Sequence, residues 1–313
     1  MNQNDTIKTT RAALLALFAA VAQAAVSPEE ARQLGGAVLT EFGAERAGNK
    51  DGSIPAYTGE RVKTAANYDP AEPRQLPDPF NDKPLFSITA QNVGQHADKL
   101  SETQKAMLAT YPGYRLDVYS SRRTAYFPKY VIDNTLKNAT SCKGENGELS
   151  LSGCYGGIMF PIPKTGNQVM WNHVTRYVGH AWLLNIKSVY VTPDGTPVVQ
   201  GHSKIHQEFS IYDPSKAGQV LPGDTLYYKF RLDQMGPARR IGERVVYLYP
   251  LDPIDVGPRI YQYLPGQRRV KLAPDLSYDT PNPQSGGAAT SDETSLFSGA
   301  QDRYDFKLAG KKE

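Results

Sequence analysis

Hydrophobic and polar positions divide the chain into a mixed N-terminal part and a strand-rich C-terminal part. In the N-terminal part, capping boxes at Ser27–Glu30 and Ser101–Gln104 predict the starts of two helices. Pro128 predicts the start of a third helix, with its apolar stripe at Val131, Ile132, Thr135 and Leu136. Residues 68–84 carry five prolines and predict an extended strap.

Beyond residue 177 the pattern changes to short β-rich runs separated by tight turns. The turns Thr192–Gly195 and Pro265–Gly266 separate neighbouring runs and predict an antiparallel meander. The runs TLYYKFRL and RVVYLYPL have apolar or aromatic residues on both faces. Such a sheet must be covered on one face and must line something on the other. The predicted strands are 177–191, 197–212, 225–234, 240–251, 259–264 and 267–272.

The most unusual stretch is GGIMFPIPKTGNQVMWNHV, residues 156–174, an apolar segment that leads into a helix start. A capping box at Thr165–Gln168 predicts a helix that ends before Gly179. The helical period places Val169, Met170, His173, Val174 and Tyr177 on one stripe. We expect this segment to cross and plug the mouth of a cavity. The candidate cavity or plug residues are Met159, Phe160, Ile162, Met170, Trp171, His173, Val174 and Tyr177.

The N-terminus has the pattern of a secretory signal peptide. Lys8 and Arg11 precede the apolar run 12–21, and Ala22-Gln23-Ala24 is a small-residue cleavage signature. The sequence therefore predicts cleavage after Ala24 and an exported mature protein. No later segment is long and apolar enough to predict a transmembrane helix.

Charge and cysteine usage narrow the function classes. The formal net charge is +3 with the basic residues dispersed, so nothing indicates nucleic-acid binding. Cys142 and Cys154 flank a turn-rich loop without further cysteine or histidine nearby. In an oxidising compartment this pattern predicts a structural disulfide rather than a metal site.

No catalytic or metal motif is evident. His173 has no serine, cysteine or carboxylate at motif spacing, which favours a hydrogen-bonded core histidine over a general base. His202 and His206 are four residues apart in a predicted strand, about 13 Å by strand rise, too far for one zinc ion. The sequence predicts no metal, no cofactor and no enzymatic activity. A hydrolase using His173 or His206 is the alternative.

Several stretches together resemble one family of exported proteobacterial proteins, domain of unknown function 1329. They are LGGAVLTEFGAERAGNKDGSIPAYTGE, YPGYRLDVYSSRRTAYFP, GGIMFPIPKTGNQVMWNHVTRY, YLPGQRRVKLAPDLSYDTP and DRYDFKLAGKKE. The hairpin IYQYLPGQRRVKLAP is also similar to a strand pair of outer-membrane lipoprotein-sorting (Lol carrier-like) proteins. Positions matching the family's distinctive motif are Trp171, Asn172, His173 and Arg176, carried over as cavity-plug residues.

This resemblance implies a mainly β fold with some α: an unclosed antiparallel half-barrel whose concave apolar face is covered by helices. It also implies that family members continue past Glu313, so that the half-barrel is expected to be incomplete in this chain. The expected domains are a signal peptide at 1–24, an N-terminal helix, turns and strap at 25–100, and the half-barrel with its helical plug at 101–313.

The expected function is that of a periplasmic carrier or adaptor for a lipid or another long hydrophobic molecule, serving transport between the inner and outer membranes. The resemblance implies two partners, an exporter of the resistance-nodulation-division type and an outer-membrane protein. It also implies association with the outer membrane. A protein-binding sensor module of the same fold is a further alternative, and it predicts a cavity filled by the protein's own side chains.

Overall fold

The computed structural model describes residues 26–72, 76–282, 285, 287 and 289–311. The predicted signal peptide, residues 1–24, lies outside these residues. The described chain forms two compact units. The smaller unit is Glu45–Tyr126, and the larger unit combines the described residues up to Ala44 with those from Phe127 onward.

The smaller unit contains little regular structure. Strands β1 (Phe86–Ile88) and β2 (Leu116–Val118) pair antiparallel, and a 3-10 helix (Val93–Lys99) precedes helix α3 (Glu102–Thr110). The capping box predicted for α3 is confirmed, because Ser101 accepts from the Gln104 backbone and Gln104 bonds back to Ser101. The described residues of the proline-rich segment 68–84 have neither helix nor strand, but they include a turn at residues 70–71, so the segment is not extended throughout as predicted.

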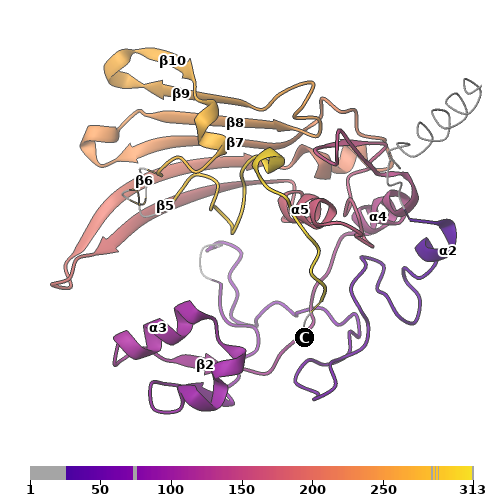
Figure 1. The fold of residues 1–313 in the computed structure, drawn as a ribbon. Helices are drawn as coiled ribbons and strands as arrows, with labels where there is room; N and C mark the ends of the chain where they lie inside the picture. Colours follow the sequence, from indigo (N-terminus) through magenta and orange to yellow (C-terminus); the bar gives the residue numbers. More distant parts are fainter. Residues whose placement is uncertain (1–25, 73–75, 283–284, 286, 288, 312–313) are drawn as a thin grey trace, which may run out of the picture. The chain divides into compact units, whose positions relative to one another are not determined.

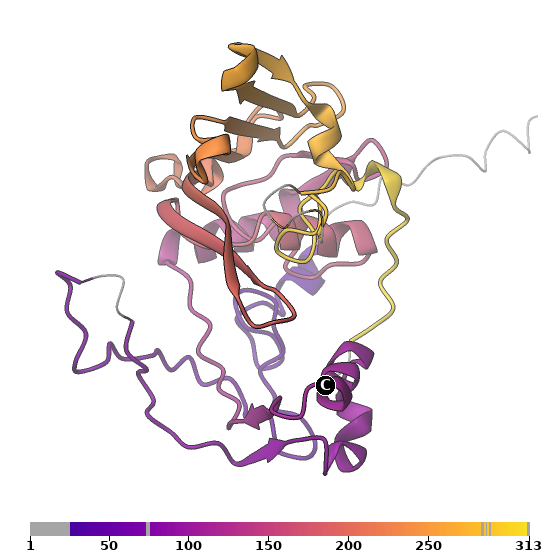
Figure 2. The ribbon, with the colours of Figure 1, turned by 90° about the vertical axis from the view of Figure 1, so that its left-hand side faces the viewer.

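The larger unit is built on a six-stranded antiparallel sheet (Figure 1). Its order, β10-β9-β8-β7-β6-β5, confirms the predicted meander, because every strand pairs with its neighbour in sequence. The sheet is not closed, and β5 and β10 form its two edges. The β5–β6 hairpin extends past the other strands (Figures 1 and 2). The strands are β5 Ala181–Val191, β6 Pro197–Glu208, β7 Leu226–Gly236, β8 Arg244–Pro250, β9 Arg259–Leu264 and β10 Arg269–Leu272.

Strand register separates the two faces of this sheet. On one face, here called the inner face, Ile205 of β6 lies between Leu184 of β5 and Leu232 of β7. The next residue, His206, lies on the opposite face opposite Arg231. Facing residues of antiparallel strands point to the same side. The alternation therefore gives the sheet an apolar inner face and a more polar outer face.

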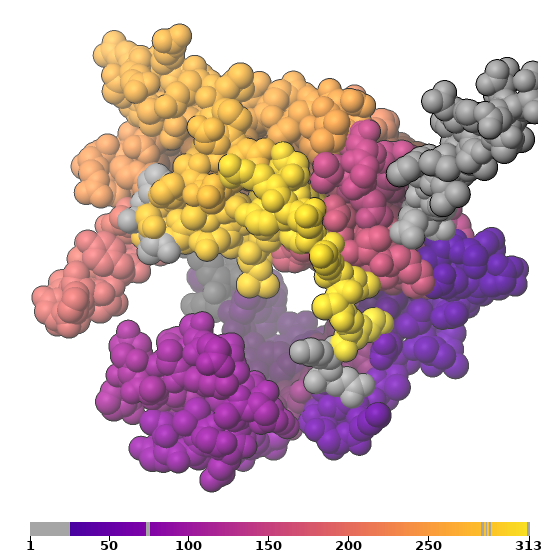
Figure 3. Space-filling model, viewed as in Figure 1, coloured from indigo at the N-terminus to yellow at the C-terminus, as the bar shows by residue number. Residues whose placement is uncertain are grey.

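The inner face is covered mainly by the C-terminal segment rather than by helices. The described residues between 276 and 298, here called the cover, lie over the sheet (Figure 3). They form turns, bends and a bridge between Pro281 and Thr290. The expected helical covering of a half-barrel is thus not what lies over most of this face.

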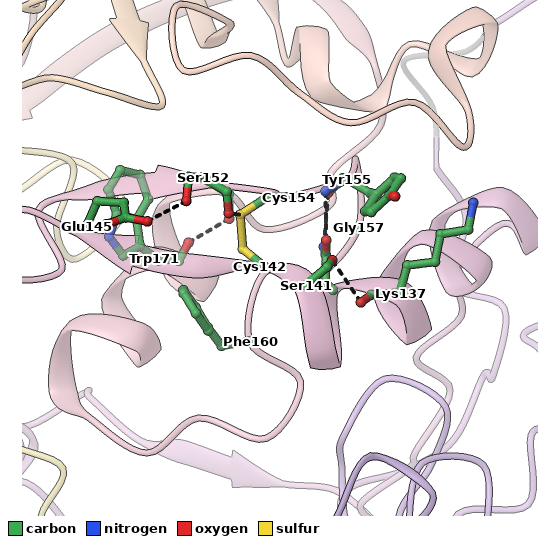
Figure 4. Close-up of a disulfide and its surroundings, with 12 residues drawn as sticks. Lys137, Ser141, Cys142, Glu145, Ser152, Cys154, Tyr155, Gly157, Phe160 and Trp171 are labelled. Carbon is green, nitrogen blue, oxygen red and sulfur yellow. Dashed lines mark hydrogen bonds between the residues drawn. A yellow bond between two sulfur atoms is a disulfide. The ribbon is translucent and has the colours of Figure 1, made fainter. Parts of the chain in front are cut away.

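The helices gather at one end of the larger unit. Helices α2 (Pro28–Ala31), α4 (Lys129–Ser141) and α5 (Gly166–Val174) begin at the predicted Ser27, Pro128 and Thr165. A hairpin of β3 (Lys143–Glu145) and β4 (Ser150–Ser152) follows α4. The Sγ atoms of Cys142 and Cys154 lie at bonding distance, 1.97 Å, in agreement with the predicted disulfide (Figure 4).

Candidate functional site

The residues predicted to plug a cavity lie mostly in a closed core around the disulfide. Met159, Phe160, Trp171 and Val174 are buried there, and Tyr177 packs against them half-buried. Figure 4 shows Phe160 and Trp171 near the Cys142–Cys154 bond. Here this cluster is called the disulfide core. Its remaining buried members are Val131, Leu151, Phe209, Ile211, Tyr212, Leu221 and Leu251.

The other predicted plug residues are placed differently. Ile162 packs against a second, smaller apolar cluster formed by Leu34, Leu39 and Ala139. Met170 is half-buried on α5. His173 is also half-buried, and its Nε2 lies 3.0 Å from the carbonyl oxygen of Phe297. The structure therefore does not bring the eight predicted residues together around a single opening.

The face that α5 buries differs from the predicted stripe. Gln168, Trp171 and Val174 are buried, whereas Val169 is 37 % exposed. Hydrogen bonding accounts for this rotation, since the Trp171 indole donates to the carbonyl oxygen of Glu148 over 2.7 Å. Gln168 Nε2 also donates to the Glu148 carboxylate over 2.9 Å. The helix thus buries Gln168 together with Trp171, and both side chains donate to Glu148.

Helix α4 fixes the start of the apolar segment by side-chain to backbone bonds. Asn138 Nδ2 donates to the carbonyl oxygens of Tyr155 and Ile158, and its Oδ1 accepts from the Tyr155 backbone. Asn134 Nδ2 donates to the carbonyl oxygen of Gly156 over 3.0 Å. Buried amides need such partners to offset the loss of water. Residues 155–158 therefore lie directly against the helix; a side chain at position 157 would clash with Thr135 of α4, and one at position 156 would clash with the carbonyl oxygen of Ile211.

A cavity of about 260 Å³ lies instead between the inner face of the sheet and the cover. We call it the inner cavity. Its sheet side is apolar and largely aromatic, and its cover side contributes polar groups from Asn282, Ser291, Thr294 and Ser298. The apolar floor includes Ile205, Leu232, Tyr228, Phe230, Tyr247 and Tyr249.

Four aromatic side chains form a continuous row along this floor. Tyr228 and Phe230 stack with ring centroids 6.0 Å apart, and Phe230 meets Tyr247 edge-on at 5.5 Å. Tyr247 then stacks on Tyr249 at 6.2 Å. Burial raises the pKa of Tyr228 and of Tyr247, and it raises the pKa of Tyr249 to about 12. The hydroxyls are therefore neutral at physiological pH.

A smaller cavity of about 160 Å³ lies on the other side of Tyr249. Trp171 and Tyr227 line it, with their rings edge-on at 6.0 Å, together with Tyr278 and Gln301. Trp171 is thus the one predicted plug residue in either of these two cavities. Phe160 and Ile162 line only a cleft of about 10 Å³.

One end of the inner cavity carries an ion pair. Arg240 and Glu243 both line the cavity, and both Nε and Nη2 of Arg240 lie 3.0 Å from Glu243 Oε2. The third nitrogen, Nη1, is buried and has no hydrogen-bond partner among the residues that the structure describes. Leaving a buried donor unpaired costs about 1–3 kcal/mol. Arg240 therefore keeps one buried donor that the described residues leave unsatisfied.

The two histidines of the hydrolase alternative differ in their surroundings from His180. Neither His173 nor His206 forms an ion pair with a carboxylate within the described residues, and His206 lies exposed on the outer face. His180 approaches Glu208 at 4.0 Å. Although burial raises it, hydrogen bonds from Ser210 and Lys229 hold the pKa of Glu208 below its ordinary value. Ser210 thus donates its hydroxyl hydrogen to the Glu208 carboxylate over 2.6 Å rather than to a histidine.

The described part of the chain has no group of three or more His, Cys, Asp or Glu side chains that could hold a metal ion. His202 and His206 lie four residues apart on the same strand, β6. Within the described residues, no helix combines the length and hydrophobicity that crossing a membrane requires.

Sequence reasoning inferred that the sheet lines something on one face, but it placed the candidate residues between Met159 and Tyr177 and not around the inner cavity. The cover has no hydrophobic period, so it gave no signal of its position over the sheet. The available signal was the doubly apolar pattern of TLYYKFRL and RVVYLYPL, residues 225–232 and 244–251. These two runs supply the aromatic row, because they form β7 and β8.

Comparisons with known proteins identify the family to which the chain belongs. Residues 87–313 match the family described as "Protein of unknown function (DUF1329)". The chain is also 38 % identical over 324 residues to an uncharacterized protein of Pseudomonas aeruginosa, covering 98 % of this chain and 68 % of that protein. No solved structure matches the chain.

Proposed function

We propose, from the premise that the chain belongs to the DUF1329 family, that it is a carrier or adaptor for a lipid or similar long hydrophobic molecule. In this proposal the ligand lies in the inner cavity, on the aromatic row of β7 and β8. The cover must move to admit and release it. The observation that carries the proposal is a cavity with an apolar, aromatic floor under a cover whose described residues have no α-helix and no strand.

The physical basis of binding is burial of apolar surface. Each methylene transferred from water contributes about 0.8 kcal/mol, so an acyl chain is held without any charge contact. A volume of about 260 Å³ lies just below the range of about 300–1,000 Å³ for small-molecule sites. This size supports one small amphiphile at a time rather than a lipid with several acyl chains.

The open antiparallel sheet supports the half-barrel part of the proposal. A half-barrel of the lipoprotein-sorting type needs an unclosed sheet with one apolar concave face, and the six-stranded meander fits that requirement. In this chain the C-terminal cover takes the place of most of the covering helices. Helix α5 contributes Trp171 to the smaller cavity at the edge of the floor.

Export to the periplasm is part of the same proposal. The signal-peptide pattern at residues 1–24 and the Cys142–Cys154 pair both suit an oxidising compartment. There the protein would pass its ligand between the inner and outer membranes. An exporter of the resistance-nodulation-division type and an outer-membrane protein are the proposed partners.

A matched pair of cavity variants tests the carrier function. Val245 lines the inner cavity, whereas Val246, the next residue of β8, lies on the outer face. We expect Val245→Trp to fill the cavity and abolish binding of tritium-labelled palmitic acid and its methyl ester. Val246→Trp should bind both as the unaltered protein does. Equilibrium dialysis measures binding, and circular dichroism checks that both variants are folded.

Native mass spectrometry of protein purified from the periplasm gives a second test. We expect a mass increment from a co-purified hydrophobic molecule that is absent from Val245→Trp. Recovery of the protein without such an increment, together with failure to bind either labelled probe, would refute the carrier proposal. Release of free palmitate from the methyl ester, lost in His173→Ala or His206→Ala, would instead establish the hydrolase alternative.

A further inference from the structure

The inner cavity has a particular electrostatic composition. Of its lining residues, only Arg240 and Glu243 carry charge, and they form an ion pair with each other. The other polar lining residues, such as Gln262, Asn282 and Ser298, are neutral. The cavity lining therefore has no net charge to balance a charged ligand.

One buried hydrogen-bond donor of the same cavity lacks a partner among the described residues, the Nη1 atom of Arg240. Tyr228 and Tyr247 also line the floor, and burial keeps their hydroxyls neutral. A ligand that satisfies Nη1 must supply a hydrogen-bond acceptor.

The ion pair restricts which acceptor fits. Glu243 already occupies Nε and Nη2 of Arg240, and the pair is largely withdrawn from solvent, with 14 % and 24 % of the two side chains exposed. A ligand carboxylate at Nη1 would place a second negative charge beside one guanidinium in a weakly screened environment. Like charges in such a site oppose each other strongly. A carbonyl oxygen accepts the same hydrogen bond without adding charge.

We propose that the ligand of the inner cavity is a neutral acyl ester, whose carbonyl oxygen accepts a hydrogen bond from Arg240 Nη1, rather than a free fatty acid. This inference rests on the proposed carrier function and names its ligand class. The acyl chain lies along the aromatic row, and the ester group lies at the Arg240–Glu243 end. Nη1 is fully buried, so the groups around it must shift for the ester carbonyl to reach it.

The test compares dissociation constants for methyl palmitate and palmitate at pH 8. We expect the unaltered protein to bind the ester at least tenfold more tightly. Arg240→Met keeps the length of the side chain but removes its donors, and it should weaken ester binding about tenfold. Arg239→Met is the matched control, because Arg239 is exposed in the same turn and does not line the cavity.

A charge variant separates recognition from a merely structural role. Glu243→Gln removes the negative charge while keeping the shape, so the guanidinium becomes free to balance a carboxylate. We expect palmitate to bind about tenfold more tightly to this variant than to the unaltered protein, with little change for methyl palmitate. Loss of packing alone would weaken both ligands together, and thermal unfolding of each variant reveals such a loss.

The outcomes distinguish the two proposals. If the unaltered protein binds neither ligand, the carrier function itself fails. If it binds palmitate as tightly as the ester, or if Arg240→Met leaves the ratio of the two constants unchanged, the ester inference is overturned while the carrier function stands. A higher ester preference that is lost in Arg240→Met and reversed in Glu243→Gln supports both.

Discussion

The disulfide core and the inner cavity belong to one compact unit, yet their buried polar groups differ in hydrogen bonding. In the core, Asn138 uses both atoms of its amide in three hydrogen bonds to residues 155–158. In the cavity, the buried Nη1 atom of Arg240 lacks a partner within the described residues. Completed bonding is typical of a structural core, whereas the unpaired donor is the group that we propose a ligand to satisfy.

This difference explains why the most unusual stretch of sequence was a poor guide to the candidate cavity. The segment 156–174 is unusual because it satisfies tight packing: two glycines against α4 and a tryptophan hydrogen-bonded to a carbonyl oxygen. The strands that line the cavity need only alternate apolar residues, which many β proteins have. An odd sequence can therefore reflect a packing demand rather than a ligand.

The largest expected effect is in the closed core. A Cβ at Gly157 would lie 2.5 Å from the backbone nitrogen of Thr135, inside α4, where the helix cannot move aside. We expect Gly157→Ala to lower the free energy of unfolding by about 3–5 kcal/mol. Gly266→Ala, with no atom within 4 Å of the added carbon, should change it by less than about 0.5 kcal/mol. Urea denaturation measures both.

A similar value for the two glycine variants would contradict the close approach of residues 155–158 to α4.

The next prediction compares one substitution in the two regions. Leu151 of β4 is 2 % exposed in the disulfide core, and Leu232 of β7 is 8 % exposed on the cavity floor. Leu151→Ala should cost about 3–4 kcal/mol, because it leaves a new void in a filled interior. Leu232→Ala should cost about 2 kcal/mol, because one side of that leucine already borders open volume.

Chemical denaturation of both leucine variants without added lipid checks this order. Equal losses would mean that the floor is as tightly packed as the core. That result would remove the contrast on which the cavity assignment depends.

The smallest expected effect concerns Tyr249, which borders both cavities. Its hydroxyl oxygen lies 3.0 Å from Ser277 Oγ. Burial raises its pKa from 10 to about 12, so the stability it contributes is complete below pH 10 and is lost as pH rises through 12. Tyr249→Phe should cost about 1 kcal/mol at pH 8. It should also make stability fall less steeply between pH 10 and 12.

Unfolding curves at pH 8, 10, 11 and 12 give that slope for the unaltered protein and the variant. A variant whose stability falls as steeply as that of the unaltered protein would show that Tyr249 does not titrate in the fold.

Much of the fold follows from local sequence signals. Strand β9 has the predicted bounds Arg259–Leu264, and Ser101 caps α3 as predicted. Turn residues and capping boxes act over a few neighbours, so their effect can be worked out without the rest of the chain. The faces of the helices depend on distant partners and were less predictable.

Helix α4 illustrates that limit. Its predicted apolar stripe included Leu136, which is 40 % exposed, whereas polar Asn134 and Asn138 are buried. Those amides are buried because residues 155–158 present their backbone to the helix, a contact that spans about twenty residues of sequence. The inner cavity could not be predicted for the same reason. Residues from 276 onward cover strands that precede them in the chain by dozens of positions.

The meander has a consequence for how the chain folds. Each strand of the sheet pairs with the next one along the chain, so its contacts close short loops and can form early. The cover meets the sheet at much greater sequence separation, since Ile186 of β5 and Ser298 of the cover line the same cavity. Such contacts close late, because their entropic cost is larger. The sheet therefore exposes its aromatic row before the cover packs onto it. A hydrophobic ligand of the proposed kind would then be enclosed while the chain folds.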